Sequence, residues 1–329
     1  MIAFFDLEGP LCPIDHAAEV MELIGKKLGK EHDFYQLFNM ISIYDDELFL
    51  VEKKKDYWPG DTLKLIAPII ISYANEKELL EISNKAIPTP GAKELFNFLH
   101  KKKIPTYIIS TSYTQHAYTI AKKLKHPIEN VRCTTLDFSL KPDNLDLLDE
   151  LFDEIFPRYL KDGLTEVKND LDNFFFKKIP QSNFEPVFSS TIVCGGGRKR
   201  EAVIEILKQN NLTASEAIAI GDSITDTQML DYVRKAKGIA VSFNGNQHSL
   251  KPANIAYSGK SIYPLKQLFT SYPNSKQWVT EKKDNEKEME KKQEFFYMIE
   301  GITEEELQKI VILQKKYRKM LREKAAQLT

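Results

Sequence analysis

Several features that would place a chain in a specialised class are scarce in this sequence. It has three cysteines, Cys12, Cys133 and Cys194, in 329 residues, without any Cys-X-X-Cys spacing. An odd number of separated cysteines predicts reduced thiols in a cytosolic protein, not a disulfide framework or a cysteine metal site. The net charge is only −1, so there is no general bias toward nucleic acid or a membrane surface.

Long apolar runs are missing as well. The longest candidate, Leu63 to Tyr73, is well short of the ~18 to 20 residues that span a membrane. The first apolar stretch is short and is interrupted by Asp6, so no signal peptide is expected. Hydrophobic residues nevertheless make up 42% of the chain, enough for one α/β core with inserted modules. We therefore expect a cytoplasmic protein without a membrane span.

The most distinctive feature lies near the start of the chain. The apolar run Ile2 to Phe5 predicts a short buried strand that ends at Asp6, and a second acid, Glu8, precedes a Gly-Pro turn. Open α/β folds bind ligands at the carboxyl ends of their strands. Two carboxylates at this spacing can divide nucleophilic attack and proton transfer between them. Asp6 is therefore the candidate nucleophile, and Glu8 is the candidate acid/base.

Three later segments carry polar groups at comparable positions. Residues 104–112 predict a strand that ends in a cluster of hydroxyls, and residues 198–207 predict an amphipathic helix with a lysine in its first turn. Residues 217–226 predict another strand, which runs into two aspartates. The polar residues of the three segments are Ser110, Thr111, Lys199, Asp222 and Asp226.

These residue types suit phosphoryl transfer, which needs a nucleophile, charge neutralisation and a proton source for the leaving group. Asp6 would form an aspartyl-phosphate. Asp222 and Asp226 offer the hard oxygen ligands that Mg²⁺ prefers, with Asp6 and a backbone carbonyl to complete the shell. Lys199 would offset the negative charge, while the Ser110 hydroxyl and neighbouring backbone amides hold a phosphoryl oxygen.

In this order the motifs resemble those of the haloacid dehalogenase-like (HAD) phosphohydrolases, most closely the phosphoserine phosphatase branch. The segment Pro90-Gly91-Ala92 and the Lys-X-Glu of Lys199 and Glu201 are similar to that branch. The resemblance implies an α/β fold: a Rossmann-like, doubly wound parallel sheet with a helical cap inserted after the first strand. It also implies that Glu8 contributes its carbonyl to the Mg²⁺ site.

One residue departs from the usual pattern. Most phosphatases of the superfamily have Asp where this chain has Glu8. Its Asp-Leu-Glu-Gly sequence is similar to phosphoserine:homoserine phosphotransferase-like enzymes, and to archaeal HAD-like proteins named energy-converting hydrogenase A subunit R. Glutamate can do the same acid/base work with a different reach, so phosphatase and phosphotransferase both stay open.

Two classes of function follow from these observations. The first is a Mg²⁺-dependent phosphatase or phosphotransferase that acts on a small phosphorylated metabolite. The second is a HAD-like subunit with an assembly or regulatory role in a larger complex. A scaffold would be free to lose the catalytic set, whereas this chain retains all of it, so we favour the enzyme; the fold alone would not justify that preference.

The spacing of the motifs indicates where additional modules lie. The predicted core comprises residues 1–11, 89–138 and 190–272, with a helical cap at 12–88, an accessory helical insertion at 139–189 and a charged helical extension at 273–329. Within the cap, Asp45 and Asp46 belong to a polar cluster. That cluster is either a solvated turn or a site at which Asp45 or Asp46 captures a substrate amine or hydroxyl.

The two later modules carry their own predictions. The accessory insertion either covers the active-site entrance or forms a partner surface, and its run Phe174 to Phe176 is more typical of core than of interface. In the extension, Thr303 and Glu306 predict the start of a long helix. Its apolar stripe is expected to pack on the body or on another subunit, so a homo-oligomer or a protein partner stays open. Its mixed charges disfavour nucleic acid.

Overall fold

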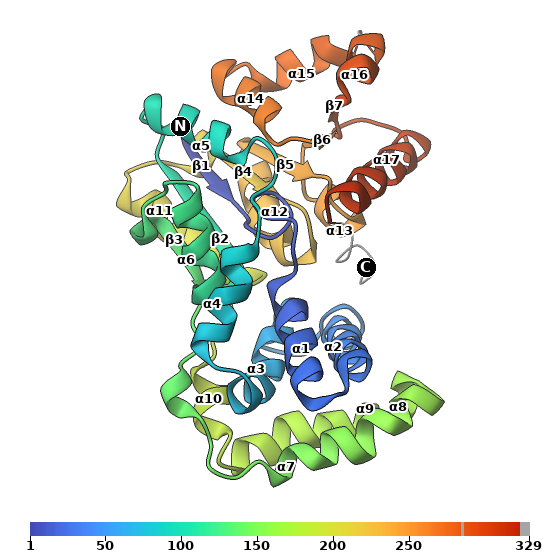
Figure 1. Ribbon diagram of the computed structural model, residues 1–329. Helices are drawn as coiled ribbons and strands as arrows, with labels where there is room; N and C mark the ends of the chain where they lie inside the picture. The colour runs from blue at the N-terminus through green and yellow to red at the C-terminus, as the bar shows by residue number, and fades with distance from the viewer. Residues whose placement is uncertain (284–285, 323–329) are drawn as a thin grey trace.

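The computed structural model describes residues 1–283 and 286–322 (Figure 1). The strands of this described part form one sheet in the order β3-β2-β1-β4-β5-β6-β7. Their bounds are β1 Ile2–Phe5, β2 Thr106–Tyr113, β3 Val131–Thr134, β4 Ala217–Gly221, β5 Ile239–Phe243, β6 Ile255–Gly259 and β7 Glu294–Met298. Neighbours from β3 to β6 are parallel, and β7 is antiparallel to β6.

The α-helices fall into three groups. Those around the sheet are α5 Ala92–Lys101, α6 Thr114–Lys123, α11 Gly197–Gln209, α12 Thr227–Lys235, α13 Gln247–Leu250 and α14 Lys266–Thr270. Those of the insertions are α1 His16–Leu28, α2 Glu31–Asp46, α3 Thr62–Tyr73, α4 Glu76–Lys85, α7 Asp146–Asp149, α8 Phe156–Asp162, α9 Leu164–Asn173 and α10 Glu185–Ser190. The C-terminal helices are α15 Ser275–Lys283, α16 Glu286–Lys292 and α17 Glu304–Arg322. None of these described helices is long and apolar enough to cross a membrane.

The two faces of the sheet are covered by different helices, as the alternation of strand side chains requires. In β1, Ile2 and Phe4 pack with residues of α11 and α12. Ala3 and Phe5 pack on the other face, with residues of α5, α6 and α14. The result is a three-layer, doubly wound α/β fold, and the predicted fold class is confirmed.

The C-terminal extension is not purely helical, and the prediction was wrong on this point. Residues Glu294–Met298 form β7, which lengthens the sheet beyond β6. Phe296 of this strand is buried, and its ring centroid lies 4.5 Å from that of Tyr257 in β6. The strand was missed because its five residues lie directly after a run of charged, helix-favouring residues and alternate only weakly.

The two helical insertions, which we expected as separate modules, share one hydrophobic core. Buried residues of α1–α3 and of the segment from α7 to α10 belong to a single cluster. Tyr44 of α2 donates a hydrogen bond to Asp172 of α9 at 2.5 Å, and its ring stacks on Phe175. Phe174 and Phe175 are buried, so this run is core as predicted. Figure 1 shows this helical unit on one side of the sheet domain, at the end where β1 leads into α1.

Helix α17 begins as the sequence predicted. Thr303 and Glu306 form a capping box, in which Glu306 Oε2 accepts from the Thr303 amide at 2.9 Å and Thr303 Oγ1 accepts from the Glu306 amide at 3.2 Å. Further along, Ile310 and Val311 join a buried cluster with residues of α13 and β6. The helix therefore packs on the body of the chain.

Candidate active site

The site forms at the carboxyl edge of the sheet, where β1 ends between β2 and β4. The Asp6 amide donates to the Ile220 carbonyl at 2.8 Å, which extends the strand pairing up to Asp6. Lys199, in the first turn of α11, reaches Asp6 from the side. Its Nζ lies 2.6 Å from Asp6 Oδ1 and 2.7 Å from Asp226 Oδ1, and the whole lysine is buried.

Asp6, Lys199 and Asp226 form a buried triad of charges, in which burial and the neighbouring charges shift the pKa of Lys199 in opposite directions. Burial alone would lower the pKa of Lys199, but the carboxylates of Asp226 and Asp6 outweigh it and raise that pKa above its ordinary value. For Asp6, burial and the neighbouring Asp226 charge raise the pKa, and Lys199 counteracts them. A buried charge is tolerated only when it is paired. Lys199 therefore offsets part of the cost of burying the Asp6 carboxylate.

Asp226 organises the loop after β4. Its Oδ2 accepts hydrogen bonds from the amides of Asp222 at 2.9 Å and Ser223 at 3.1 Å, while Oδ1 pairs with Lys199. Gly221 makes room for it, because a Cβ there would lie 2.5 Å from Asp226 Cγ. Both oxygens of Asp226 are thus engaged by the protein, so its evident role is to position Lys199 and Asp222.

Asp222 is the acid best suited to a metal ion. Its Oδ1 is buried and has no hydrogen-bond partner among the described residues. Asp6, Asp222 and Asp226 each offer a carboxylate oxygen, and these oxygens lie within 4.8 Å of one another. Such a donor set of hard oxygens fits a small divalent cation. Of the predicted metal ligands, the structure brings these three together.

The Glu8 carboxylate faces away from that cluster. Its Oε1 accepts from Ser112 Oγ at 2.6 Å and from the His16 amide at 3.3 Å. Burial, followed by the charge of Asp15, raises the pKa of Glu8 to about 7. A carboxyl group with this pKa exchanges protons at neutral pH, as an acid/base requires. As a metal ligand Glu8 would have to use its carbonyl.

The two hydroxyl residues of β2 differ in position. Ser110 is fully buried, and its Oγ accepts from the Ser112 amide at 3.0 Å, which shapes the end of the strand. Thr111 lines the cavity beside Asp6. A phosphoryl group in the cavity would therefore meet Thr111 directly.

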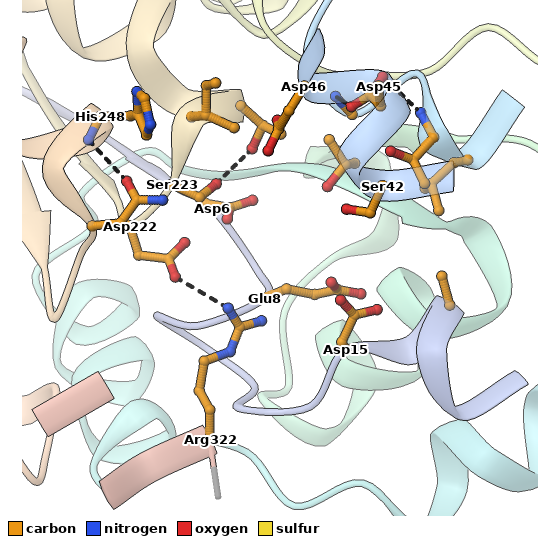
Figure 2. A pocket seen from close by; sticks show the side chains of 18 of the residues that line it. Asp6, Glu8, Asp15, Ser42, Asp45, Asp46, Asp222, Ser223, His248 and Arg322 are labelled. Carbon is orange, nitrogen blue, oxygen red and sulfur yellow. Dashed lines mark hydrogen bonds and ion pairs between the residues drawn. The ribbon is translucent and has the colours of Figure 1, made fainter. Parts of the chain in front are cut away.

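A cavity of about 360 Å³ lies between the sheet edge and the helical unit. Figure 2 shows Ser42, Asp45 and Asp46 of α2 on one side of it and Asp6 and Asp222 on the other. The remaining lining residues come from α1, α2, α3, β2, α13, α17 and the loops around them: Glu8, Asp15, Ala17, Phe38, Gly60, Thr62, Leu63, Thr111, Ser223, Ile224, Thr225, Asn246, Gln247, His248, Lys315, Arg318 and Arg322.

Asp45, which we predicted to bind substrate, lines this cavity but has its carboxylate engaged. It accepts from Tyr57 Oη at 2.6 Å and from the amides of Gly60 at 3.0 Å and Thr62 at 3.1 Å. Burial raises its pKa to about 7, and the Tyr57 hydrogen bond opposes that shift. Asp45 thus builds the loop of the cap that faces the sheet edge, whereas Asp46 is exposed.

That loop contacts the core directly. A Cβ on Gly197, at the start of α11, would lie 2.5 Å from the Trp58 ring, so glycine allows the loop to approach. Arg198, the next residue, pairs with Asp61 at 2.6 Å. The helical unit therefore meets α11 at the residues that precede Lys199.

Sequence analysis missed the arginines of α17. Arg318 is buried, and its Nη1 contacts Asp222 Oδ2 and donates to the Asp222 carbonyl at 3.2 Å. Arg322 Nη1 lies 3.5 Å from the same Oδ2. A signal was present in the apolar stripe of this helix, which contains the polar Gln314 one turn before Arg318. A polar residue on the packing face indicates a buried polar partner.

Comparisons with known proteins now become informative. A model of the haloacid dehalogenase-like hydrolase family matches residues 69–256, more than half of the chain. The chain belongs to this family. The predicted family and its hydrolase class are thereby confirmed, while the likeness to the hydrogenase-subunit proteins stays a prediction. No curated protein sequence matches the chain.

A solved structure of low sequence identity shares the fold. The gene product AF1437 from Archaeoglobus fulgidus has a TM-score of 0.81 at 22% identity, over 99% of this chain and 98% of that one. The extent of this match includes the insertions and the C-terminal extension. Two others are more distant. A phosphoserine phosphohydrolase-like protein from Francisella tularensis has a TM-score of 0.48 at 17% identity, over 81% of this chain and 98% of that one. Phosphoserine phosphatase in its apo form has a TM-score of 0.49 at 13% identity, over 80% of this chain and 96% of that one.

Proposed function

We propose that this HAD-like hydrolase is a Mg²⁺-dependent phosphatase or phosphotransferase for a small phosphorylated metabolite. The observation that carries the proposal is the buried triad of Asp6, Lys199 and Asp226, next to a carboxylate oxygen of Asp222 that has no hydrogen-bond partner in the described part of the chain. An ion pair with a purely structural role would not need a neighbouring carboxylate, that of Asp222, with an unused oxygen at the wall of a cavity. The match of residues 69–256 to the haloacid dehalogenase-like hydrolase family agrees with a hydrolase.

In the reaction, a carboxylate oxygen of Asp6 attacks the phosphorus atom and forms an aspartyl-phosphate, while the bond to the leaving oxygen breaks. Lys199 holds Oδ1 at 2.6 Å, which fixes the orientation of the nucleophile. It also balances part of the negative charge that gathers when a phosphate approaches. Thr111 and neighbouring amides would hold a non-reacting phosphoryl oxygen.

A divalent cation fits beside this nucleophile. Asp6 and Asp222 would hold it through their carboxylates, with the Glu8 carbonyl as the further ligand that the resemblance implies. Asp226 would support the set from behind, because its own oxygens are already engaged. When bound, Mg²⁺ would supply charge neutralisation between the acids and the phosphate.

Glu8 supplies the proton for the leaving group. With a pKa of about 7, roughly half of the Glu8 side chains carry a proton at neutral pH. After donating it, the carboxylate can accept a proton from the water, or from the alcohol, that attacks the aspartyl-phosphate. Water as acceptor gives a phosphatase, and an alcohol acceptor gives a phosphotransferase.

The test is a panel of small phosphomonoesters assayed for phosphate release, with Mg²⁺ and with the metal chelated. We expect turnover of at least one substrate with Mg²⁺, silence after chelation and recovery when Mg²⁺ is returned. Asp6→Asn should abolish turnover while the circular dichroism spectrum stays unchanged. A fully active Asp6→Asn protein would refute the covalent mechanism.

Adding small alcohols to the productive reaction separates the two enzyme activities. Transfer appears as a new phosphoester at the expense of phosphate, and hydrolysis appears as phosphate alone. No turnover on any substrate, from a folded protein with Mg²⁺ bound, would instead support the role as a subunit of a complex.

A further inference from the structure

Helix α17 is fixed on the sheet edge by one buried glutamine. Gln314 Oε1 accepts from the Gly245 amide at 2.6 Å and from Ser242 Oγ at 2.9 Å. Its Nε2 donates to the carbonyls of Ser242 at 2.9 Å and Tyr257 at 3.2 Å. Because these four partners lie on β5, β6 and the loop after β5, they set both the rotation and the register of the helix.

This register delivers two guanidinium groups to the cavity. Positions 314, 318 and 322 are four residues apart and therefore share one face of the helix. Arg318 contacts Asp222 Oδ2, and Arg322 Nη1 lies 3.5 Å from the same oxygen. Arg322 Nε also donates to the Pro13 carbonyl at 3.1 Å. Figure 2 shows Arg322 extending from α17 toward Asp222.

The two arginines and a divalent cation would therefore use the same carboxylate. Asp222 Oδ1 is the unpartnered oxygen suited to the cation, and Oδ2 carries both guanidinium contacts. Like charges a few ångströms apart repel each other even at the effective dielectric constant of protein sites. Arg318 and Lys199 are both buried, so solvent screens little of the repulsion between their positive charges and a bound cation.

We propose that docking of α17 opposes cation binding, so that this helix sets the affinity of the site for Mg²⁺. The inference rests on the proposed function, because it concerns the same cation. Arg318 and Arg322 lower the affinity by neutralising Asp222. Linkage is reciprocal, and a bound cation accordingly weakens the docking of α17 by the same factor. When α17 moves away from Asp222, the site should bind Mg²⁺ more tightly.

The first test is Mg²⁺ binding by isothermal titration calorimetry, which needs no substrate. Arg318→Met and Arg322→Gln should each bind Mg²⁺ at least tenfold more tightly than the unchanged protein. Lys319→Met is the matched control, since it removes one charge from an exposed position of the same helix and should change the affinity less than twofold. Gln314→Ala, which removes no charge, should also tighten binding because it loosens the helix.

The proposal depends on whether the substitutions strengthen or weaken Mg²⁺ binding. Weaker or equal binding by Arg318→Met would show that the arginine positions Asp222 for the cation or is irrelevant to it, and would overturn the proposal. Should Arg318→Met fail to fold, Arg322→Gln and Gln314→Ala are read in the same way. If no protein of the series binds Mg²⁺, the proposal is refuted as well.

The reciprocal effect is measured by hydrogen exchange. Saturating Mg²⁺ should increase amide exchange in residues 304–322, and Asp222→Asn should abolish that increase. Unchanged or slower exchange would contradict the coupling. Neither measurement uses phosphate release, so a protein that binds Mg²⁺ with the expected coupling but lacks turnover would refute the proposed activity alone.

Discussion

Two buried histidines at the junction between the helical unit and the core make the stability of this protein depend on pH. The ring of His16, at the start of α1, stacks on that of His116 of α6 with centroids 4.6 Å apart. His16 Nε2 lies 3.1 Å from the Leu79 carbonyl and 3.0 Å from Ser83 Oγ. Burial lowers the pKa of His16 from 6.5 to about 4. For His116, burial and the neighbouring His16 lower the pKa well below its ordinary value.

The sign follows from proton binding. As the pH falls through 6.5, the unfolded chain protonates His16 while the folded chain does not, so the free energy of unfolding decreases. With a pKa of about 4 in the folded state, His16 alone removes about 2 kcal/mol between pH 7 and pH 5. His16→Gln should remove this part of the dependence, because an amide can keep a hydrogen bond to Leu79 without titrating.

The assay is urea unfolding at pH 5, 6, 7 and 8, compared as slopes so that any constant cost of the substitution cancels. His16→Gln should lose about 2 kcal/mol less than the unchanged protein over pH 7 to 5. His32→Gln, at an exposed position of α2, is the control and should leave the slope unaltered. Equal slopes for the unchanged protein and His16→Gln would refute the assignment.

Three further predictions concern the site. Lys199→Met leaves two buried carboxylates unpaired, so it should cost about 3 to 5 kcal/mol in urea unfolding and abolish turnover. Gly221→Ala places a Cβ 2.5 Å from Asp226 Cγ, and the displacement should cost about 1 to 3 kcal/mol and reduce kcat at least tenfold. Ser112→Ala removes the hydrogen bond that lowers the pKa of Glu8, so the falling limb of kcat/KM should move from about pH 7 to higher pH.

Each of these has a contrary outcome. If Lys199→Met lowers the free energy of unfolding by less than 1 kcal/mol, as the exposed Lys208→Met on the same helix should, the ion pairs of Lys199 do not stabilise the site. Unchanged kcat in Gly221→Ala would show that Asp226 can move without consequence. A falling limb at the same pH in Ser112→Ala would exclude Glu8 as the titrating acid.

The candidate site at the sheet edge was predictable because its signals are local. A buried strand reads as an apolar run, and a polar residue at its end lies at the sheet edge whatever the rest of the chain does. Asp6, Lys199 and Asp222 were found in this way, and the structure brings them together at the ends of β1 and β4 and the start of α11. The order of the motifs then sufficed to predict the family.

The contributions of distant segments were not predictable from such patterns. Strand β7 depends on the free edge of β6, and the arginines of α17 depend on the register that Gln314 imposes. In both cases the decisive partners lie in other segments: β6 pairs with β7, and Ser242, Gly245 and Tyr257 hold Gln314. Asp45 shows a further contribution of tertiary structure. Its carboxylate accepts from the Gly60 amide and holds the loop around that residue, while its contact with a substrate stays a prediction.

The second insertion contributes to the cavity only through long-range packing. One of its two predicted roles was to cover the entrance, yet none of the cavity-lining residues in the described chain belongs to residues 139–189. These residues instead pack against α2, where Asp172 accepts a hydrogen bond from Tyr44. Tyr44 directly precedes the cavity-lining residue Asp45. Deleting residues 139–189 would remove about a third of the buried residues of the shared core and unfold the cap, so the result would say nothing about selectivity. Tyr44→Phe removes a single hydrogen bond from that packing. We therefore expect it to change discrimination between substrates of different size, measured as the ratio of their kcat/KM values, while leaving kcat for the smallest substrate unchanged.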